Sequence, residues 1–241
     1  MKITKTKDCG VDKLKMIIYG EPGSGKTTLA GTIGEPTLII SAESGLLSLR
    51  GHSIDVIDMT TDDDGVLIPK EKRITRLQAI FAYLLTEECK SRYKWIFIDS
   101  LTEISQNLVE QLQLEFPERK DSLVLYGENA KRMRSLIKSF RDLPHYGVIF
   151  TALSTIDKDE NNQRFTGLSL IGKIADSAPG LLDEVFYLAT KQDPETGAIE
   201  RRLITSKTEK LVAKDRSGVL NHLEPADLGL IIKKIRGESN V

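Results

Sequence analysis

The chain has 241 residues, 40% of them hydrophobic and 29% charged, which is close to the composition of ordinary globular proteins. Its 34 Lys and Arg against 35 Asp and Glu give a formal net charge of −1. These values exclude a wholly disordered chain and a polycation that coats nucleic acid by bulk charge, so any nucleic-acid contact must come from a local patch.

The length fits one α/β domain with a full hydrophobic core, and the sequence contains no evident interdomain linker. We therefore expect a single domain over residues 1–241, with a short basic N-terminal segment and a C-terminal helix and tail. Cys9 and Cys89 stand far apart without a His at metal-ligand spacing, which predicts reduced thiols in a cytoplasmic protein. No apolar run is long enough to cross a membrane, so no membrane contact is expected.

Short apolar runs alternate with longer amphipathic runs along the first two thirds of the chain, a pattern typical of a parallel sheet covered by helices. The apolar runs predict strands at residues 15–19, 37–42, 54–59, 94–99 and 147–153. The amphipathic runs predict helices at residues 26–33, 73–89, 101–114 and 128–143.

The last third has a different pattern. Residues 184–189 and 199–206 have the composition of strands, and the turn-rich segment 193–197 between them predicts an antiparallel hairpin. Residues 226–235 predict a closing helix. The expected fold is therefore α/β, with a mainly parallel sheet flanked by helices and an antiparallel C-terminal strand pair.

The strongest motif follows the first predicted strand and matches GxxxxGK[ST]. Its residues are Gly20, Glu21, Pro22, Gly23, Ser24, Gly25, Lys26 and Thr27, with Thr28 next to it. The glycines let the backbone fold closely around phosphate oxygens. The lysine can reach the β- and γ-phosphates of ATP, and the Thr27 hydroxyl can ligate Mg²⁺. This stretch therefore predicts a phosphate-binding loop (P-loop).

Carboxylates at the ends of two other predicted strands complete the expected site. Asp99 ends the strand 94–99, where it can hold Mg²⁺ opposite Thr27, as a Walker B aspartate does. Glu43 follows the strand 37–42 and should lie at the same edge of the sheet, where it can act as the general base for ATP hydrolysis. Glu43 can also be read as a loop acid or a neighbour of a helix N-cap.

The three motifs taken in order, the P-loop, the strand end Ile-Ile-Ser-Ala-Glu and the strand end Phe-Ile-Asp-Ser, resemble the core of RecA-type recombinases. The resemblance covers about residues 14–216 and implies a RecA-like P-loop NTPase core. Within that family the chain is most similar to short phage-encoded proteins reduced to the ATPase core, which act in single-strand DNA annealing and homologous recombination. It implies Mg-dependent ATP hydrolysis with Glu43 as the base, in the host cytoplasm if the chain is phage-encoded.

The same resemblance implies partners. These are single-stranded DNA, further copies of the chain in a ring or filament, and a single-strand DNA-binding protein as an additional candidate. RecA-like proteins hold DNA with two loops, which map to about residues 115–127 and 154–173. The residues expected to contact DNA are Lys120, Arg164, Phe165 and Lys173.

Cations near the C-terminal strands match those that RecA-like proteins present to the ATP of a neighbouring subunit. The candidates for this trans role are Lys207, Lys210 and Arg216. One departure concerns the end of the strand 147–153, where the family usually carries a polar sensor and this chain has Leu153. Thr151 or Ser154 could replace it, and the departure weakens the expected coupling of hydrolysis to DNA binding.

Two alternative functions remain open from the sequence. One is an ATP-dependent regulatory switch or assembly factor that binds a protein partner without DNA. The other is a DNA motor ATPase, which the lack of an evident accessory domain disfavours. Binding of single-stranded DNA with and without Mg·ATP separates the main interpretation from the first alternative.

Overall fold

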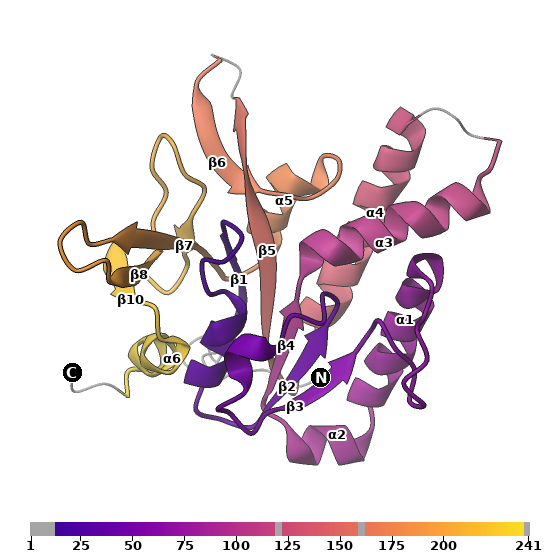
Figure 1. Ribbon diagram of the computed structural model, residues 1–241, viewed down its shortest axis with the longest axis horizontal. Coiled ribbons are helices and arrows are strands. Elements are labelled where there is room, and N and C mark those ends of the chain that lie inside the picture. Colours follow the sequence, from indigo (N-terminus) through magenta and orange to yellow (C-terminus); the bar gives the residue numbers. More distant parts are fainter. Residues whose placement is uncertain (1–12, 119–121, 159–161, 239–241) are drawn as a thin grey trace, which may run out of the picture.

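The computed structural model describes residues 13–118, 122–158 and 162–238 (Figure 1). At its centre lies a sheet with the strand order β10-β8-β7-β1-β5-β4-β2-β3. These strands are β1 (Lys15–Gly20), β2 (Thr37–Ser41), β3 (Asp55–Asp58), β4 (Trp95–Asp99), β5 (Gly147–Lys158), β7 (Glu184–Gln192), β8 (Ile199–Ile204) and β10 (Leu223–Pro225). Neighbours from β7 to β3 run parallel, and β8 and β10 are antiparallel to the strands beside them. The predicted fold class is confirmed.

Helices cover both faces of the sheet, because the central strands are apolar on both sides. In β1, Ile17 and Tyr19 pack into one layer of the core, and Met16 and Ile18 pack into the other. The first layer is closed by α1 (Arg73–Leu84), α2 (Glu87–Arg92), α3 (Leu101–Glu115), α4 (Ser122–Arg141) and α5 (Ile174–Leu181). The second is closed by the 3₁₀ helices η2 (Thr27–Thr32) and η3 (Leu47–Leu49) and by α6 (Leu228–Arg236).

Two predicted helices differ from the structure. The segment predicted as a helix over 26–33 forms the 3₁₀ helix η2, in which the N–H groups of Leu29 and Ile33 bond to carbonyls three residues back. Three threonines and a glycine in this stretch lower its α-helix propensity. The helix predicted over 73–89 is divided into α1 and α2. The Thr86 hydroxyl accepts a hydrogen bond from the Cys89 N–H and so caps a new helix.

The segment expected to form the second DNA loop, residues 154–173, is largely a β-hairpin. β5 continues to Lys158, and β6 (Arg164–Leu168) returns antiparallel to it. The hairpin rises beyond the rest of the sheet, on the side opposite α2 (Figure 1). The side chains of residues 155–158 and of Arg164 are exposed and mostly polar, so no apolar run marked this part of the hairpin in the sequence.

The segment expected to form the first DNA loop, residues 115–127, is also mostly not a loop where it is described. α3 extends to Glu115 and α4 begins at Ser122, so Tyr126 belongs to a helix. Lys120 lies outside the described residues. Within the described parts of the chain, no helix is long and apolar enough to cross a membrane.

Candidate nucleotide-binding site

The carboxyl ends of the parallel strands bring the predicted site residues to one edge of the sheet. The P-loop follows β1, Glu43 follows β2, Asp99 ends β4, and Thr151 lies in the adjacent strand β5. Parallel strands end at a common edge, so residues distant in sequence come together there. The structure thus juxtaposes the P-loop with both carboxylates.

The P-loop backbone is shaped by its glycines. Gly23 and Gly25 have φ values of 74° and 100°, in the region that side-chain-bearing residues rarely adopt. A Cβ on Gly20 would lie 2.9 Å from the Leu188 carbonyl oxygen, so this position has no room for a side chain. The buried Ser24 hydroxyl has no hydrogen-bond partner among the described residues.

The Lys26 ammonium is held inside the loop that precedes it. Its Nζ donates to the carbonyl oxygens of Gly20 and Glu21, at 3.1 and 2.8 Å. Burial lowers the pKa of Lys26, while the charges of Asp99 and Glu43 act in the opposite direction and favour the ammonium form. Carboxylates from two other strands therefore surround the cation that the motif supplies for phosphate.

Two hydroxyls meet the Asp99 carboxylate. Thr27 Oγ1 donates to Asp99 Oδ2, and Thr151 Oγ1 donates to Asp99 Oδ1. Mg²⁺ prefers oxygen ligands and is commonly held by one or two protein groups together with nucleotide phosphates. The Thr27 and Asp99 oxygens beside Lys26 fit that chemistry. No group of three or more acidic, His or Cys side chains that could hold a metal occurs in the described parts of the chain, so water and phosphate oxygens would supply the other ligands.

Glu43 is oriented by the residue that follows Asp99. The buried Ser100 hydroxyl donates to Glu43 Oε1 and also caps α3 by accepting from the Glu103 N–H at 3.4 Å. Glu43 lines an open cavity of about 460 Å³, which also borders Leu153 and Arg73. A water molecule has room beside this carboxylate. Leu153 contributes no polar group there, as the sequence indicated, and Thr151 contacts Asp99 instead.

One residue beside the P-loop had no role assigned from the sequence. Arg201, on β8, donates from Nε to the Ser24 carbonyl oxygen at 3.0 Å. The basic composition of residues 201–216 drew attention to this region, but the contact joins residues 177 positions apart. Only the pairing of β8 with β7 reveals it.

The other predicted residues lie away from the P-loop. Lys207 and Lys210 are on a segment beside the β5–β6 hairpin, where the Thr166 N–H donates to the Lys210 carbonyl oxygen at 2.7 Å. Arg216 lies near the amino end of β7 and pairs with Asp183 at 2.6 Å. Arg164 and Phe165 are on β6, and Lys173 precedes α5.

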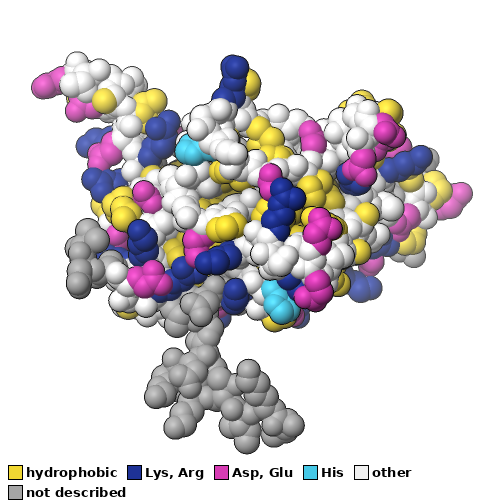
Figure 2. Space-filling model, turned by 90° about the horizontal axis from the view of Figure 1, so that it is seen from below, with side chains coloured by type: hydrophobic (Ala, Val, Ile, Leu, Met, Phe, Trp, Pro, Cys, Tyr) yellow, Lys and Arg dark blue, Asp and Glu magenta, His cyan; other side chains and the backbone are white. Residues whose placement is uncertain are grey.

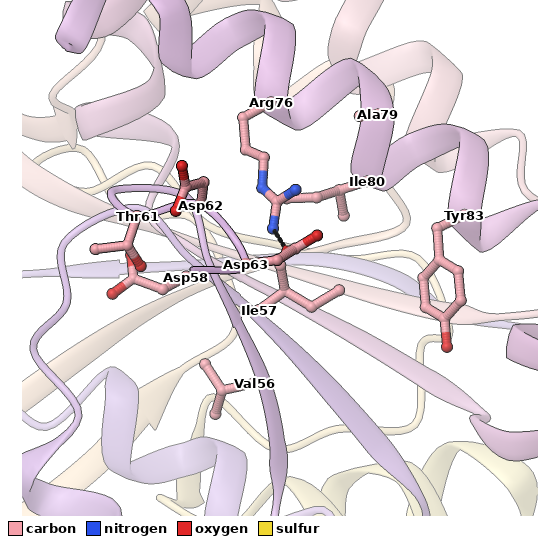
Figure 3. Close-up of a pocket in the computed structure, with 10 residues that line it drawn as sticks. All are labelled: Val56, Ile57, Asp58, Thr61, Asp62, Asp63, Arg76, Ala79, Ile80 and Tyr83. Atoms are coloured by element: carbon pink, nitrogen blue, oxygen red, sulfur yellow. Dashed lines mark hydrogen bonds and ion pairs between the residues drawn. The ribbon is translucent and has the colours of Figure 1, made fainter. Parts of the chain in front are cut away.

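A separate cavity of about 480 Å³ lies between the edge strand β3 and α1 (Figure 3). Arg76 of α1 points toward Asp63 and forms an ion pair with it (Figure 3). None of the residues predicted for ATP or DNA lines this cavity.

The fold and the P-loop define a class of protein. The chain has an α/β fold in which a P-loop follows the first strand of a mainly parallel sheet. It belongs to the AAA domain family, whose model matches residues 12–217.

Solved structures similar to the chain include the two described next. No curated protein sequence matches the chain. A KaiC-like protein from the hyperthermophilic archaeon Pyrococcus horikoshii OT3 is 13% identical, over 82% of this chain and 80% of that one, with a TM-score of 0.44. An ATPase from the type III secretion system of pathogenic bacteria is 17% identical, over 73% of this chain, with a TM-score of 0.47. The chain spans about half of that ATPase, 52% of its length.

Proposed function

We propose that this protein is a Mg-dependent ATPase that assembles as a homo-oligomer on single-stranded DNA and promotes annealing in homologous recombination. It would act in the manner of the short phage-encoded RecA-like proteins. The observation that carries the proposal is the position of the β5–β6 hairpin. It is a direct continuation of β5, the strand in which Thr151 contacts the Walker B residue Asp99.

The chemistry of ATP hydrolysis follows from the residues at the carboxyl edge. Lys26 stabilises the negative charge on the β- and γ-phosphates. Glu43, held by the Ser100 hydroxyl, orients the attacking water and accepts its proton. Thr27 and Asp99 would hold Mg²⁺, which when bound would supply positive charge that offsets the charge of the phosphates.

The proposed DNA contact is the end of the hairpin. Lys158 and Arg164 lie opposite each other in the β5–β6 register, and Ile156 nearby is 69% exposed. Cations paired with exposed apolar side chains suit the backbone and bases of a single strand. By contrast, positive and negative side chains are interspersed on the face seen from below, where α2 lies (Figure 2). A polyanion would find no uniformly basic surface there.

A tyrosine links the P-loop to the hairpin. Tyr19, directly before Gly20, donates to the carbonyl oxygen of Val212 and lies 3.3 Å from that of Thr166 on β6. The hairpin and the segment that carries Lys210 are therefore tied to the strand that leads into the P-loop. This connection supports a proposal in which nucleotide and DNA influence each other.

The proposed trans cations are Lys207 and Lys210. Both side chains are exposed, and neither ammonium has a hydrogen bond or ion pair in the part of the chain that the structure describes. Arg216, which pairs with Asp183, is the weaker candidate for this role. A cation inserted into the neighbouring site would stabilise the charge that develops on the γ-phosphate.

Fluorescence anisotropy of a labelled single-stranded oligonucleotide tests the DNA part of the proposal. We expect binding that strengthens with Mg·ATP and weakens as salt increases, because phosphate contacts release counterions. A Lys158→Ala/Arg164→Ala double variant should bind more weakly. The matched control is Lys90→Ala/Arg92→Ala, which removes the same charge from α2 at the opposite end. ATP binding without any DNA binding by the unaltered protein would instead favour the regulatory switch.

A further inference from the structure

The β7–β8 hairpin brings an arginine to the P-loop of the same chain. β8 runs antiparallel to β7, so the first residues of β8 lie at the carboxyl edge of the sheet. Arg201 pairs with Thr190 in this register. Two positions further along, on the same face of the strand, Leu203 is buried in the layer that contains Leu29 of η2. Arg201 thus lies on the side of the sheet that the P-loop helix covers.

The contact between Arg201 and the loop is close. Its Nε donates to the Ser24 carbonyl oxygen at 3.0 Å. A Cβ built on Gly25 would lie 2.9 Å from that same Nε, so the glycine at this position makes room for the arginine. The motif requires a glycine before Lys26 for its backbone conformation, and here the absence of a side chain also admits Arg201.

The guanidinium of Arg201 has hydrogen-bond donors that are not used within the described structure. Nε is fixed on the loop, and neither Nη group has a hydrogen bond or ion pair in the part of the chain that is described. The next residue behaves differently, because Arg202 points to the opposite face and pairs with Glu200 at 2.7 Å. A planar guanidinium with two free Nη groups, held at one edge beside a phosphate loop, matches the geometry that binds phosphate oxygens.

We propose that Arg201 is a nucleotide-binding residue of its own subunit, whose Nη groups contact the α- and β-phosphates of the nucleotide. The inference rests on the proposed nucleotide site. Arg201 contacts the Ser24–Gly25 stretch, and P-loop backbone of this kind cradles the α- and β-phosphates. Glu43 and Asp99, by contrast, come from β2 and β4, on the other side of β1 from β8. Arg201 therefore binds the part that ATP and ADP share.

An interaction with the shared phosphates contributes equally to the binding of ATP and ADP and little to the chemical step. Loss of this interaction should weaken the binding of ATP and of ADP by the same factor. A charge-assisted hydrogen bond is worth about 1.5–3 kcal/mol, which corresponds to roughly 10- to 100-fold in Kd.

The test is a fluorescence titration with methylanthraniloyl-ATP and methylanthraniloyl-ADP in the presence of Mg²⁺. Arg201→Ala should raise both Kd values at least about tenfold, and Arg201→Lys should raise them less. Arg202→Ala is the matched control and should leave both unchanged. Thermal unfolding of each variant checks the fold, and Arg201→Lys keeps the test informative if the alanine variant unfolds. Adding Lys26→Ala protein to Arg201→Ala protein should restore no binding, because both residues serve the same subunit.

Three results would overturn the inference. If Arg201→Ala and Arg202→Ala bound both nucleotides with equal affinity, Arg201 would not be part of the binding site. If Arg201→Ala weakened the binding of ATP but not of ADP, Arg201 would contact the γ-phosphate instead. If mixing the two variants restored binding, Arg201 would serve a neighbouring subunit. If the unaltered protein bound neither nucleotide, the proposed function itself would be wrong. That outcome is distinguishable from the other three because it is seen without any variant.

Discussion

Buried charges occur at both edges of the central sheet, but their partners differ. At the amino edge, Lys15 Nζ donates to the carbonyl oxygens of Leu143 and Tyr146, and Glu184 accepts from the Ser217 N–H at 3.3 Å. Burial lowers the pKa of Lys15 to about 8 and raises that of Glu184 to about 8. These groups fasten connecting segments to the ends of strands, and their pKa values move toward the neutral forms.

At the carboxyl edge, the charged groups face one another from different strands. Asp99 and Glu43 favour the charged form of Lys26 against its burial, and Ser24 and Arg201 keep unused hydrogen-bonding groups beside it. The comparison teaches that burial of a charge does not by itself mark a functional site. The carboxyl edge is distinguished by a P-loop between its opposite charges, because the backbone of such a loop can bind phosphate.

The largest expected effect comes from removing the central cation of the carboxyl edge. Lys26→Ala should lower ATP turnover by about 1000-fold, because loss of one group that stabilises transition-state charge costs 10²–10³. Lys15→Met is the matched control at the amino edge and should lower the melting temperature without weakening nucleotide binding. Phosphate release and thermal unfolding measure the two effects. Normal turnover by Lys26→Ala would contradict the P-loop assignment.

Loss of the proposed base should separate binding from chemistry. Glu43→Gln should bind Mg·ATP with nearly unchanged affinity and hydrolyse it about 100-fold more slowly, the usual contribution of a general base. Single-turnover hydrolysis measures this, with equilibrium binding of ATP as the companion experiment. If Glu43→Gln hydrolyses normally while Asp99→Asn does not, Glu43 has a structural role only.

A smaller effect is expected for a cation that acts between subunits. Lys210→Ala should bind ATP normally and hydrolyse it about tenfold more slowly, within the range for loss of a charge-assisted contact. Mixing it with Glu43→Gln protein should recover part of the activity, since some interfaces then combine an intact base with an intact cation. Turnover per subunit should also rise with protein concentration. A mixture no more active than its components would argue against a shared site.

A separate prediction concerns stability at the amino edge. The pKa of Glu184 is raised from 4.5 to about 8 in the fold, so between these pH values the folded protein holds a proton that the unfolded chain has lost. The free energy of unfolding should therefore fall as pH rises through this window, by at most about 1.4 kcal/mol per pH unit. Glu184→Gln should flatten the profile in urea titrations from pH 5 to 8. An unchanged slope would show that Glu184 does not titrate in this way.

The sequence allowed the sheet and the core of the site to be predicted because both depend on local patterns. Apolar runs marked the central strands, and the P-loop is contiguous from Gly20 to Thr27. The β5–β6 hairpin was missed because the end of β5 and the start of β6 are polar and exposed, so their pairing leaves no periodic signal. The contact of Arg201 with Ser24 was missed because it depends on the order of β8, β7 and β1 in the sheet. No local pattern encodes that order.

The 3₁₀ form of the helix after the P-loop was not predicted for a similar reason. Residues 26–33 carry an apolar face that predicts a helix, and only the packed structure shows its form. Gly31 approaches His52 so closely that a Cβ would lie 2.7 Å from the imidazole ring. The 3₁₀ helix therefore packs closely against the segment after η3. The hydrophobic periodicity of the sequence gives no indication of this contact.

The most direct test of the central claim is the rate of phosphate release from Mg·ATP, measured before and after addition of a single-stranded oligonucleotide. The claim is that the carboxyl edge hydrolyses ATP and that the hairpin on β5 couples it to DNA. We expect measurable release by the protein alone, an increase on adding DNA, and no such increase for Lys158→Ala/Arg164→Ala. A rate equal to that of Lys26→Ala, with or without DNA, would contradict the claim.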